Sequence, residues 1–211
     1  MTIGQAVLGF AVVAGLLTII PGIDTALVLR SAISRGRAYA FAAAAGINTG
    51  CLVWGIAAAV GASALLAASE VAYQVLTLAG AAYMVWLGIH LLRASLRPRD
   101  AAPVGSADPP RASVWHGFGT GLWTNLLNPK IGVFYLATIP QFVPDDVSPL
   151  LMGVLLAAVH NVMGMAWFTV IILATGFAAR WLARDAVAKV TDRITGTVLV
   201  AFGAKLALDS R

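Results

Sequence analysis

Long apolar stretches separated by short polar segments divide the chain into six parts. A helix needs about 20 predominantly apolar residues to cross the hydrocarbon core of a bilayer. The stretches that reach this length are approximately 4–29, 38–68, 71–92, 114–141, 149–179 and 188–208. The pattern therefore predicts an all-α integral membrane protein with six transmembrane helices.

Two of these stretches contain a proline in a position that breaks a helix. The first contains Pro21-Gly22, followed by Asp24, and the fourth contains Asn128-Pro129-Lys130. Proline lacks an amide hydrogen and clashes with the carbonyl four residues back, so each site frees backbone polar groups within the bilayer. Such backbone is tolerated at that depth only where it is packed in protein or lines a cavity. We therefore expect Pro21, Gly22 and Pro129 to break the first and fourth helices beside a cavity.

The order of helix types occurs twice along the chain. A broken, a long and a shorter stretch fill residues 1–95 and again residues 114–211, and the polar segment 96–113 with its four prolines joins the two sets. Because three is an odd number, the second set must enter the membrane from the opposite side. The sequence thus predicts a 3+3 inverted repeat with broken helices 1 and 4, typical of secondary transporters, in which 96–113 is a cytoplasmic linker.

The basic residues predict the orientation. Eleven of the 14 lysines and arginines follow the first, third and fifth stretches, nine of them in the loops and two in the first turns of the sixth stretch, whereas the other loops carry Glu70 and Asp145-Asp146. Loops rich in lysine and arginine remain in the cytoplasm. We therefore expect a multi-pass protein with both termini outside.

The composition supports the membrane assignment and excludes several functional classes. The chain is 60% hydrophobic and 11% charged, whereas a soluble domain has roughly a quarter of its residues charged. The net charge of +5 does not indicate nucleic-acid binding, because no basic stretch carries interleaved aromatic residues. With one cysteine, Cys51, and three widely separated histidines, we expect no metal site and no cofactor. No nucleophile–base pair or nucleotide-binding motif is present, so we do not expect an enzyme.

Asp24 and Lys130 are the most informative charged residues, since each follows a break where a new half-helix would begin. A carboxylate at the bilayer centre costs about 2.5–3.5 kcal/mol even on the lenient insertion scale, and such residues usually serve a function. We interpret Asp24 as a site for a proton or a substrate ammonium, with capping of the half-helix as the alternative. Lys130 would pair with Asp24 or bind a substrate carboxylate, and its alternative is a snorkelling lysine.

The amides beside the second break have two equally weighted interpretations. Asn125 and Asn128 can either satisfy freed backbone groups or contact a ligand. Among the tryptophans, Trp123 and Trp167 lie deeper than an interfacial belt requires, so either could form a wall of the site.

Two polar dipeptides occupy comparable depths in the long second and fifth stretches. Asn48-Thr49 lies between Gly46 and Gly50, whose spacing permits close helix approach, and His160-Asn161 is its counterpart. Interhelical hydrogen bonding explains both dipeptides. The alternative is that they line the cavity, with His160 as a proton relay.

Several motifs occur in a characteristic order along nearly the whole chain. They are Pro21-Gly22-Ile23-Asp24-Thr25-Ala26-Leu27-Val28 with Arg35-Gly36-Arg37, Leu78-Ala79-Gly80-Ala81-Ala82-Tyr83 with Trp86-Leu87-Gly88, and Gly117-Phe118 through Asn125-Leu126-Leu127-Asn128-Pro129-Lys130 to Pro140-Gln141-Phe142. Together they resemble the LysE/RhtB family of bacterial lysine and homoserine/threonine exporters. Ile23 replaces the second proline of the family's usual Pro-Gly-Pro, which leaves the geometry of the first break open.

The resemblance implies export of amino acids or related small metabolites across the bacterial cytoplasmic (inner) membrane, driven by the proton-motive force. The favoured hypothesis is a secondary exporter with a cavity lined by Asp24, Asn48, Asn125, Asn128, Lys130 and His160. Its partners would be an amino-acid-like substrate, protons and the lipid bilayer. Two alternatives remain open, namely an exporter of metal ions or other cations with a related fold, and a membrane assembly subunit that does not transport. The sequence does not specify an oligomeric state, so a homo-oligomer also stays open.

Overall fold

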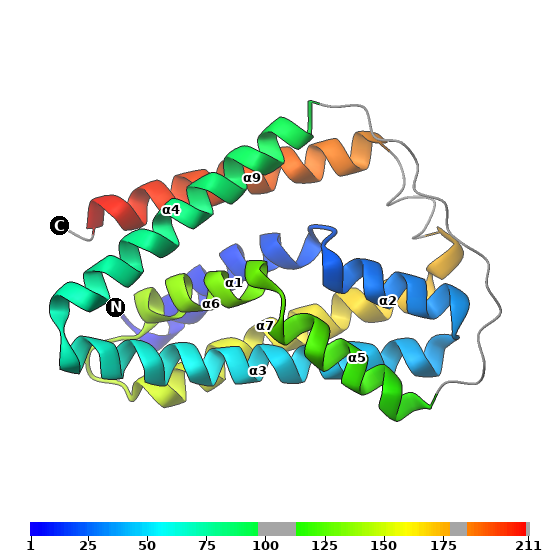
Figure 1. Ribbon diagram of the computed structural model, residues 1–211, viewed down its shortest axis with the longest axis horizontal. Helices are drawn as coiled ribbons and strands as arrows, with labels where there is room; N and C mark the ends of the chain where they lie inside the picture. Colours follow the sequence, from blue (N-terminus) through cyan, green and yellow to red (C-terminus); the bar gives the residue numbers. More distant parts are fainter. Residues whose placement is uncertain (97–112, 178–184, 210–211) are drawn as a thin grey trace.

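The structure is a computed structural model that describes residues 1–96, 113–177 and 185–209 (Figure 1). Within these ranges the ordered elements are all helical, which confirms the expected fold class as far as secondary structure is concerned. They are α1 (Ile3–Ile19), α2 (Ile23–Ser34), α3 (Arg37–Ala68), α4 (Glu70–Ala94), α5 (Val114–Leu126), α6 (Pro129–Thr138), the short 3-10 helix η1 (Ile139–Phe142), α7 (Pro149–Leu173) and α9 (Asp185–Asp209). The expected linker 96–113 lies outside the described residues, apart from its two ends.

The first break is the link between α1 and α2. Ile20, directly before Pro21, is extended with ψ 124°, as expected for a residue preceding proline. Gly22 is extended too, and its lack of a side chain leaves the N-terminus of α2 without a side-chain cap. The two helices meet at an angle of 51° and together have the length and hydropathy of one broken span.

The second break separates α5 from α6 and is closed differently. Asn128 is the N-cap of α6, and its Oδ1 accepts a hydrogen bond from the Lys130 amide at 3.1 Å. Pro129 follows as the first helical residue, where its missing amide hydrogen costs nothing. Both breaks therefore occur where the prolines predicted them, and the capping interpretation of Asn128 is confirmed.

Three single helices in the described part of the chain are long and apolar enough to cross a membrane. These segments are Arg37–Gly61 of α3, Val71–Ala94 of α4 and Pro149–Leu173 of α7, and the bent pair α1–α2 adds a fourth. The helices α5 and α6 are too short individually, at 13 and 10 residues, and α9 contains six charged residues. The expected set of six spans therefore remains a prediction.

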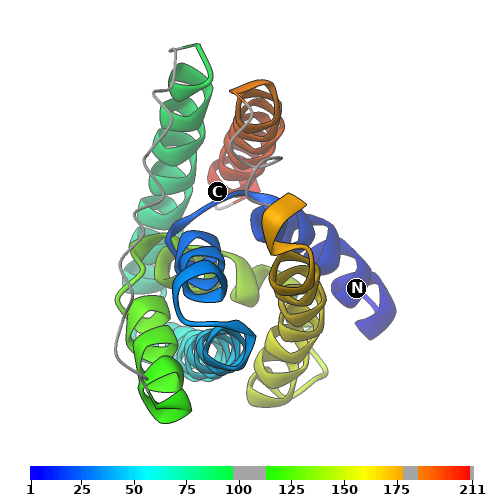
Figure 2. The same cartoon turned by 90° about the vertical axis from the view of Figure 1, so that its right-hand side faces the viewer.

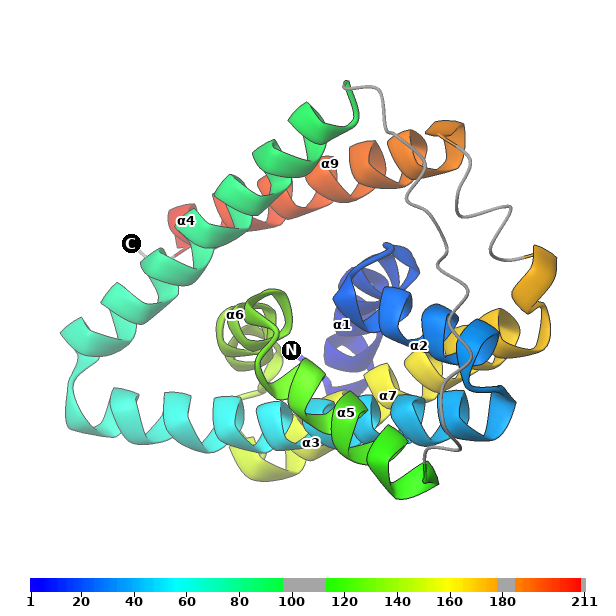
Figure 3. The same cartoon turned by 45° about the vertical axis from the view of Figure 1, so that its right-hand side comes forward.

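The helix α3 extends along the bundle, and the broken helices pack around it. Its 32 residues contact α5 and α7 extensively, together with α2 and α6 (Figure 3). The helix α1 packs on α7, so each long helix contacts a broken helix from the other half of the chain. The helices α4 and α9 form a pair on one side of this group (Figure 2).

Glycines allow the closest helix contacts. A Cβ added at Gly46 of α3 would overlap the Phe118 carbonyl of α5, and one at Gly121 of α5 would overlap the Ala43 carbonyl of α3. This confirms that the small residues around Asn48 permit close helix approach. The α4–α9 pair uses the same device, because Gly88 and Gly196 each face the other's carbonyl oxygen. Small residues are the usual means by which membrane helices approach closely.

A stability measurement tests the α3–α5 contact. We expect Gly121→Ala to destabilise the protein by about 1–3 kcal/mol or more, because the new methyl group meets rigid backbone rather than a flexible side chain. The thermal unfolding midpoint of the purified protein in detergent should fall accordingly. Gly119→Ala on the same helix is the matched control, since a Cβ there meets open space. Equal unfolding midpoints for the two variants would contradict this account of the α3–α5 contact.

Candidate functional site

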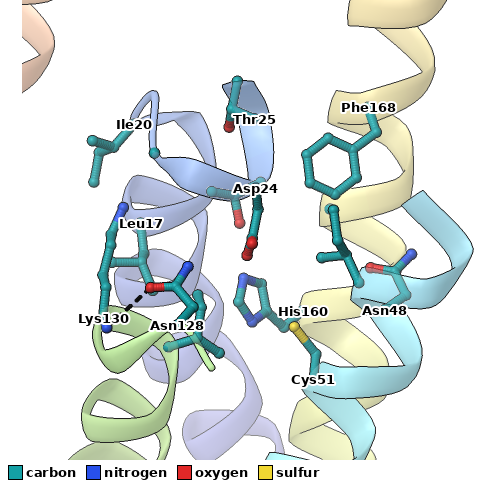
Figure 4. A pocket seen from close by; sticks show the side chains of 15 residues that line it. Leu17, Ile20, Asp24, Thr25, Asn48, Cys51, Asn128, Lys130, His160 and Phe168 are labelled. Atoms are coloured by element: carbon teal, nitrogen blue, oxygen red, sulfur yellow. Dashed lines mark hydrogen bonds between the residues drawn. The ribbon is translucent and has the colours of Figure 1, made fainter. Parts of the chain in front are cut away.

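A small polar cavity lies where the two helix breaks meet (Figure 4). Its lining comes from α1, α2, α3, α6 and α7 together with the two breaks, and consists of Leu17, Thr18, Ile20, Gly22, Asp24, Thr25, Ile47, Asn48, Cys51, Asn128, Lys130, Ile131, His160, Gly164 and Phe168. The cavity volume is about 40 Å³. At ~10–15 Å³ for each water, that space holds about three water molecules and no amino acid.

Asp24 reaches the cavity from the first turn of α2 and is 9% exposed. Its Oδ2 accepts a hydrogen bond from Asn125 Nδ2 at 2.9 Å. Its Oδ1 is buried without a hydrogen-bond partner among the described residues. An unsatisfied buried carboxylate oxygen is costly, so this atom is suited to accept a donor that enters the cavity.

Asn125 holds this carboxylate but does not itself line the cavity. It occupies the last turn of α5, fully buried, and its amide also lies 3.5 Å from Cys51 Sγ. Gly50 of α3 makes room for it, because an added Cβ there would collide with the Asn125 side chain. The second break of the chain thus supplies the hydrogen-bond donor for the acid at the first break.

Lys130 lies on the opposite side of the cavity from Phe168 (Figure 4). A Cβ built on Gly22 would lie 3.4 Å from the Lys130 ammonium nitrogen, so this charge rests against the first break. The ammonium interacts electrostatically with Asp24 and also with Asp192 of α9, which does not line the cavity. This position within the packed helices is the one expected of a site residue, and the snorkelling alternative for Lys130 stays open.

The two polar dipeptides join α3 to α7, and one residue of each lines the cavity. Asn161 Nδ2 donates to the Asn48 carbonyl at 2.9 Å, which links α7 to α3, while Asn48 and His160 line the cavity. The imidazole of His160 is stacked on the Tyr135 ring, and its Nδ1 is 2.8 Å from the Tyr135 hydroxyl. The phenol therefore fixes the orientation of His160.

Aromatic rings fill the space beyond His160, in the direction of the N-terminus of α1. Phe10 contacts both Phe134 and Phe142, with ring centroids 6.1 and 5.9 Å apart, and Phe142 stacks on Phe202 of α9. Phe10 and Phe134 also pack edge-on against His160. This cluster, which we call the aromatic layer, lies behind His160 and has no hydrogen-bonding side-chain group of its own.

The two deep tryptophans do not line this cavity. Trp123 is 62% exposed on the outer surface of α5, so its interpretation as a wall of the site is wrong. Trp167 lines a separate apolar hollow of about 300 Å³ between α1 and α7, which shares only Thr18 with the polar cavity.

Several cavity residues were not anticipated from the sequence as site residues. Cys51 lies one turn after Asn48 on α3, so its position on the same helix face was a readable signal. Thr18, Thr25, Ile47 and Phe168 carry no such signal, because ordinary core residues have the same chemistry. No group of three or more His, Cys, Asp or Glu side chains in the described ranges could hold a metal ion.

Comparison with known proteins places these features in a family. The sequence profile described as LysE type translocator matches residues 16–210. The chain belongs to the LysE type translocator family. The family assignment and the apolar helices both indicate several membrane spans, so this LysE type translocator is a multi-pass membrane protein.

Similar proteins cover almost the whole of this LysE type translocator. It is 32% identical to a leucine efflux protein of Klebsiella pneumoniae over 95% of this chain and 93% of the other. It is 30% identical to a threonine efflux protein of Salmonella typhi, over 89% and 90% of the two chains. The membrane protein YrhP of Bacillus subtilis is 28% identical over 97% and 99%. No solved structure matches the chain.

The collision predicted at Gly50 tests how Asp24 is held. Gly50→Ala should displace Asn125 and deprive Asp24 of its donor, which lowers stability by about 1–3 kcal/mol. Thermal unfolding in detergent measures this loss. Gly61→Ala on the same helix, where a Cβ meets nothing within 4 Å, is the control. If both variants unfold at the same temperature, the Asn125 contact does not hold the carboxylate as described.

Proposed function

We propose that this LysE type translocator is a secondary transporter that exports amino acids or closely related small metabolites across the bacterial cytoplasmic membrane, coupled to protons. One observation carries the proposal. Two helix breaks bring together, in one cavity, an ammonium and a carboxylate with one oxygen that has no hydrogen-bond partner in the described part of the chain. The named efflux activities of the similar proteins, for leucine and for threonine, support an amino-acid cargo.

The cavity offers a partner for each charged group of an amino acid. Asp24 Oδ1 is the acceptor for the ammonium of the cargo. The Lys130 ammonium lies against Gly22, where the first amides of α2 have no side-chain cap, and these donors together suit a carboxylate. Asn48 and Asn128 complete the polar lining, and Asn125 positions Asp24.

The same carboxylate explains coupling to protons. Asp24 cannot hold a proton and a substrate ammonium on the same oxygen, so the two ligands compete for it. A carrier that binds them alternately exchanges one for the other across the membrane. His160 lines the cavity, and the Tyr135 hydroxyl engages its Nδ1, which leaves Nε2 as the atom through which His160 would relay a proton.

The packing supports the 3+3 inverted repeat. In this arrangement α1–α2 corresponds to α5–α6, α3 to α7, and α4 to α9. The long helix of each half packs on the broken helix of the other half, and the two last helices pair with each other. Such reciprocity is expected when a pseudo-two-fold axis relates residues 1–95 to residues 114–211. Alternating access would then open the cavity first on one side and then on the other.

The alternative functions fit the cavity less well. An exporter of metal ions needs a cluster of oxygen, nitrogen or sulfur ligands, whereas Asp24 is the only carboxylate in this lining and Lys130 would repel a cation. An assembly subunit without transport activity would not require a charged pair at a helix break. The variants below distinguish it, because such a subunit would tolerate loss of the Asp24 charge.

Replacing the acid tests both binding and coupling. Asp24→Asn keeps the shape and the capping ability of the side chain but removes the titrating group. We expect efflux of a labelled amino acid to fall at least about tenfold to a hundredfold, the equivalent of a lost charge-assisted hydrogen bond. Efflux from cells or proteoliposomes measures this, and a protonophore should inhibit the wild-type protein.

The exposed loop residue Asp145 provides the control, since Asp145→Asn should leave efflux unchanged. Lys130→Met should also impair efflux, because the ammonium that would bind the substrate carboxylate is lost. The methionine keeps a similar bulk, so the effect would report the charge. Efflux by Asp24→Asn at the wild-type rate, with no effect of a protonophore on the wild type, would refute the proton-coupled mechanism.

The orientation gives a separate prediction, with both termini outside and the 96–113 segment in the cytoplasm. It depends on the positions of eleven of the 14 basic residues. A reporter that is active only in the cytoplasm should give no signal when fused to the C-terminus and a strong signal when inserted between residues 100 and 110. The opposite pattern would show that the protein has the reverse orientation. The proposed cavity chemistry would not be affected by that result.

A further inference from the structure

We infer that the cavity selects zwitterionic amino acids whose side chains are uncharged and apolar, and that Ile47 and Phe168 form the wall that contacts this side chain. The inference rests on the proposed export function and adds the class of cargo to it. Three observations carry it, namely the charge balance of the lining, the position of the apolar wall and the burial of both wall residues.

The charges that line the cavity balance each other. Asp24 supplies one carboxylate and Lys130 one ammonium, and no other aspartate, glutamate, lysine or arginine is in the lining. A zwitterion therefore finds one opposite charge for each of its own. A further charge on the side chain would be buried without a partner, which costs several kcal/mol.

Two further titratable groups lie close to these charges, and neither adds a carboxylate or an ammonium to the cavity lining. Nδ1 of His160 is engaged by Tyr135, and the imidazole packs against Phe10 and Phe134, so its surroundings are mainly apolar. Asp192 interacts with Lys130 from the side of α9 but does not reach the cavity surface. A lysine-like side chain would thus meet no second carboxylate in the lining, and a glutamate-like side chain would meet no second ammonium.

The apolar wall lies across the cavity from Lys130. Figure 4 shows the Phe168 ring on α7 facing Asp24 and Thr25, with Lys130 on the far side of Asp24. Ile47 of α3 lines the same cavity and belongs with Phe168 to one apolar cluster that includes Val28, Ala40 and Ala44. A cargo whose charged groups bind Asp24 and Lys130 would therefore direct its side chain towards Phe168 and Ile47.

Burial makes this wall energetically important. Ile47 is 2% and Phe168 6% exposed, so a side chain that contacts them is removed from water. Full burial of an aliphatic side chain contributes about 1.5–3 kcal/mol, equivalent to roughly ten- to a hundredfold in affinity. Because both residues also pack within a cluster that joins α2, α3 and α7, the wall can yield only when these helices move apart. The size of the side chain is thereby coupled to the opening of the cavity.

Two matched isoleucines provide the test. Ile47 and Ile172 are both buried in the same cluster, but only Ile47 lines the cavity. The full-length protein would be reconstituted in proteoliposomes, and efflux of labelled leucine, phenylalanine, alanine, lysine and glutamate would be measured. We expect the wild type to export leucine and to export neither lysine nor glutamate.

The variants should then separate specificity from stability. Ile47→Ala shortens a side chain of the wall and so enlarges the space for the side chain of the cargo. The ratio of phenylalanine to leucine efflux should therefore rise about tenfold. Ile172→Ala should lower all rates in proportion and leave this ratio unchanged. A ratio unaffected by Ile47→Ala, or wild-type efflux of lysine as fast as that of leucine, would overturn the inference while export itself still stood. If no amino acid were exported at all, the proposed function and this inference would fail together.

Discussion

Backbone polar groups freed within a bilayer must find partners inside the protein, and the arrangement of this molecule depends on how its two helix breaks meet that requirement. The second break is closed locally, because Asn128 caps α6. The first break has no local cap at Gly22, and the acid beside it is held by Asn125 from the other half of the chain. The side chain beside the first break therefore depends on a residue of the other half for its hydrogen bond. This dependence joins the two halves at the place where the cavity lies.

The contact between the halves also requires unusually close helix approach. Asn125 can reach Asp24 because α5 lies against α3 through glycines, and Gly50 leaves the space that its amide occupies. In a membrane the hydrophobic effect gives little drive for helix association, so close packing and hydrogen bonds must supply it. The glycines thus have two roles, one in packing and one in placing the donor for the buried carboxylate.

Much of this organisation was predictable from local sequence signals. Prolines marked both breaks, the apolar stretches marked the helices to within a few residues, and charge at bilayer depth singled out Asp24 and Lys130. The hydrogen bond between Tyr135 and His160 was not predictable, because it joins residues 25 positions apart on two helices. The roles of Ile47 and Phe168 were equally hidden, since an apolar residue in an apolar helix gives no local signal. The depth of Trp123 was misleading because depth along a helix does not determine which face points inward.

The aromatic layer beyond His160 has a consequence for how the proposed transporter would keep protons from leaking. Phe10, Phe134 and Phe142 form a region without donors or acceptors, where a chain of water molecules has nothing to hold it. Protons move rapidly along such chains, so a continuous water column would short-circuit the membrane and dissipate its voltage as heat. In the proposed transporter, such an apolar region beside the cavity would act as an electrical insulator. It would let the transporter remain in an energised membrane at rest without acting as an uncoupler.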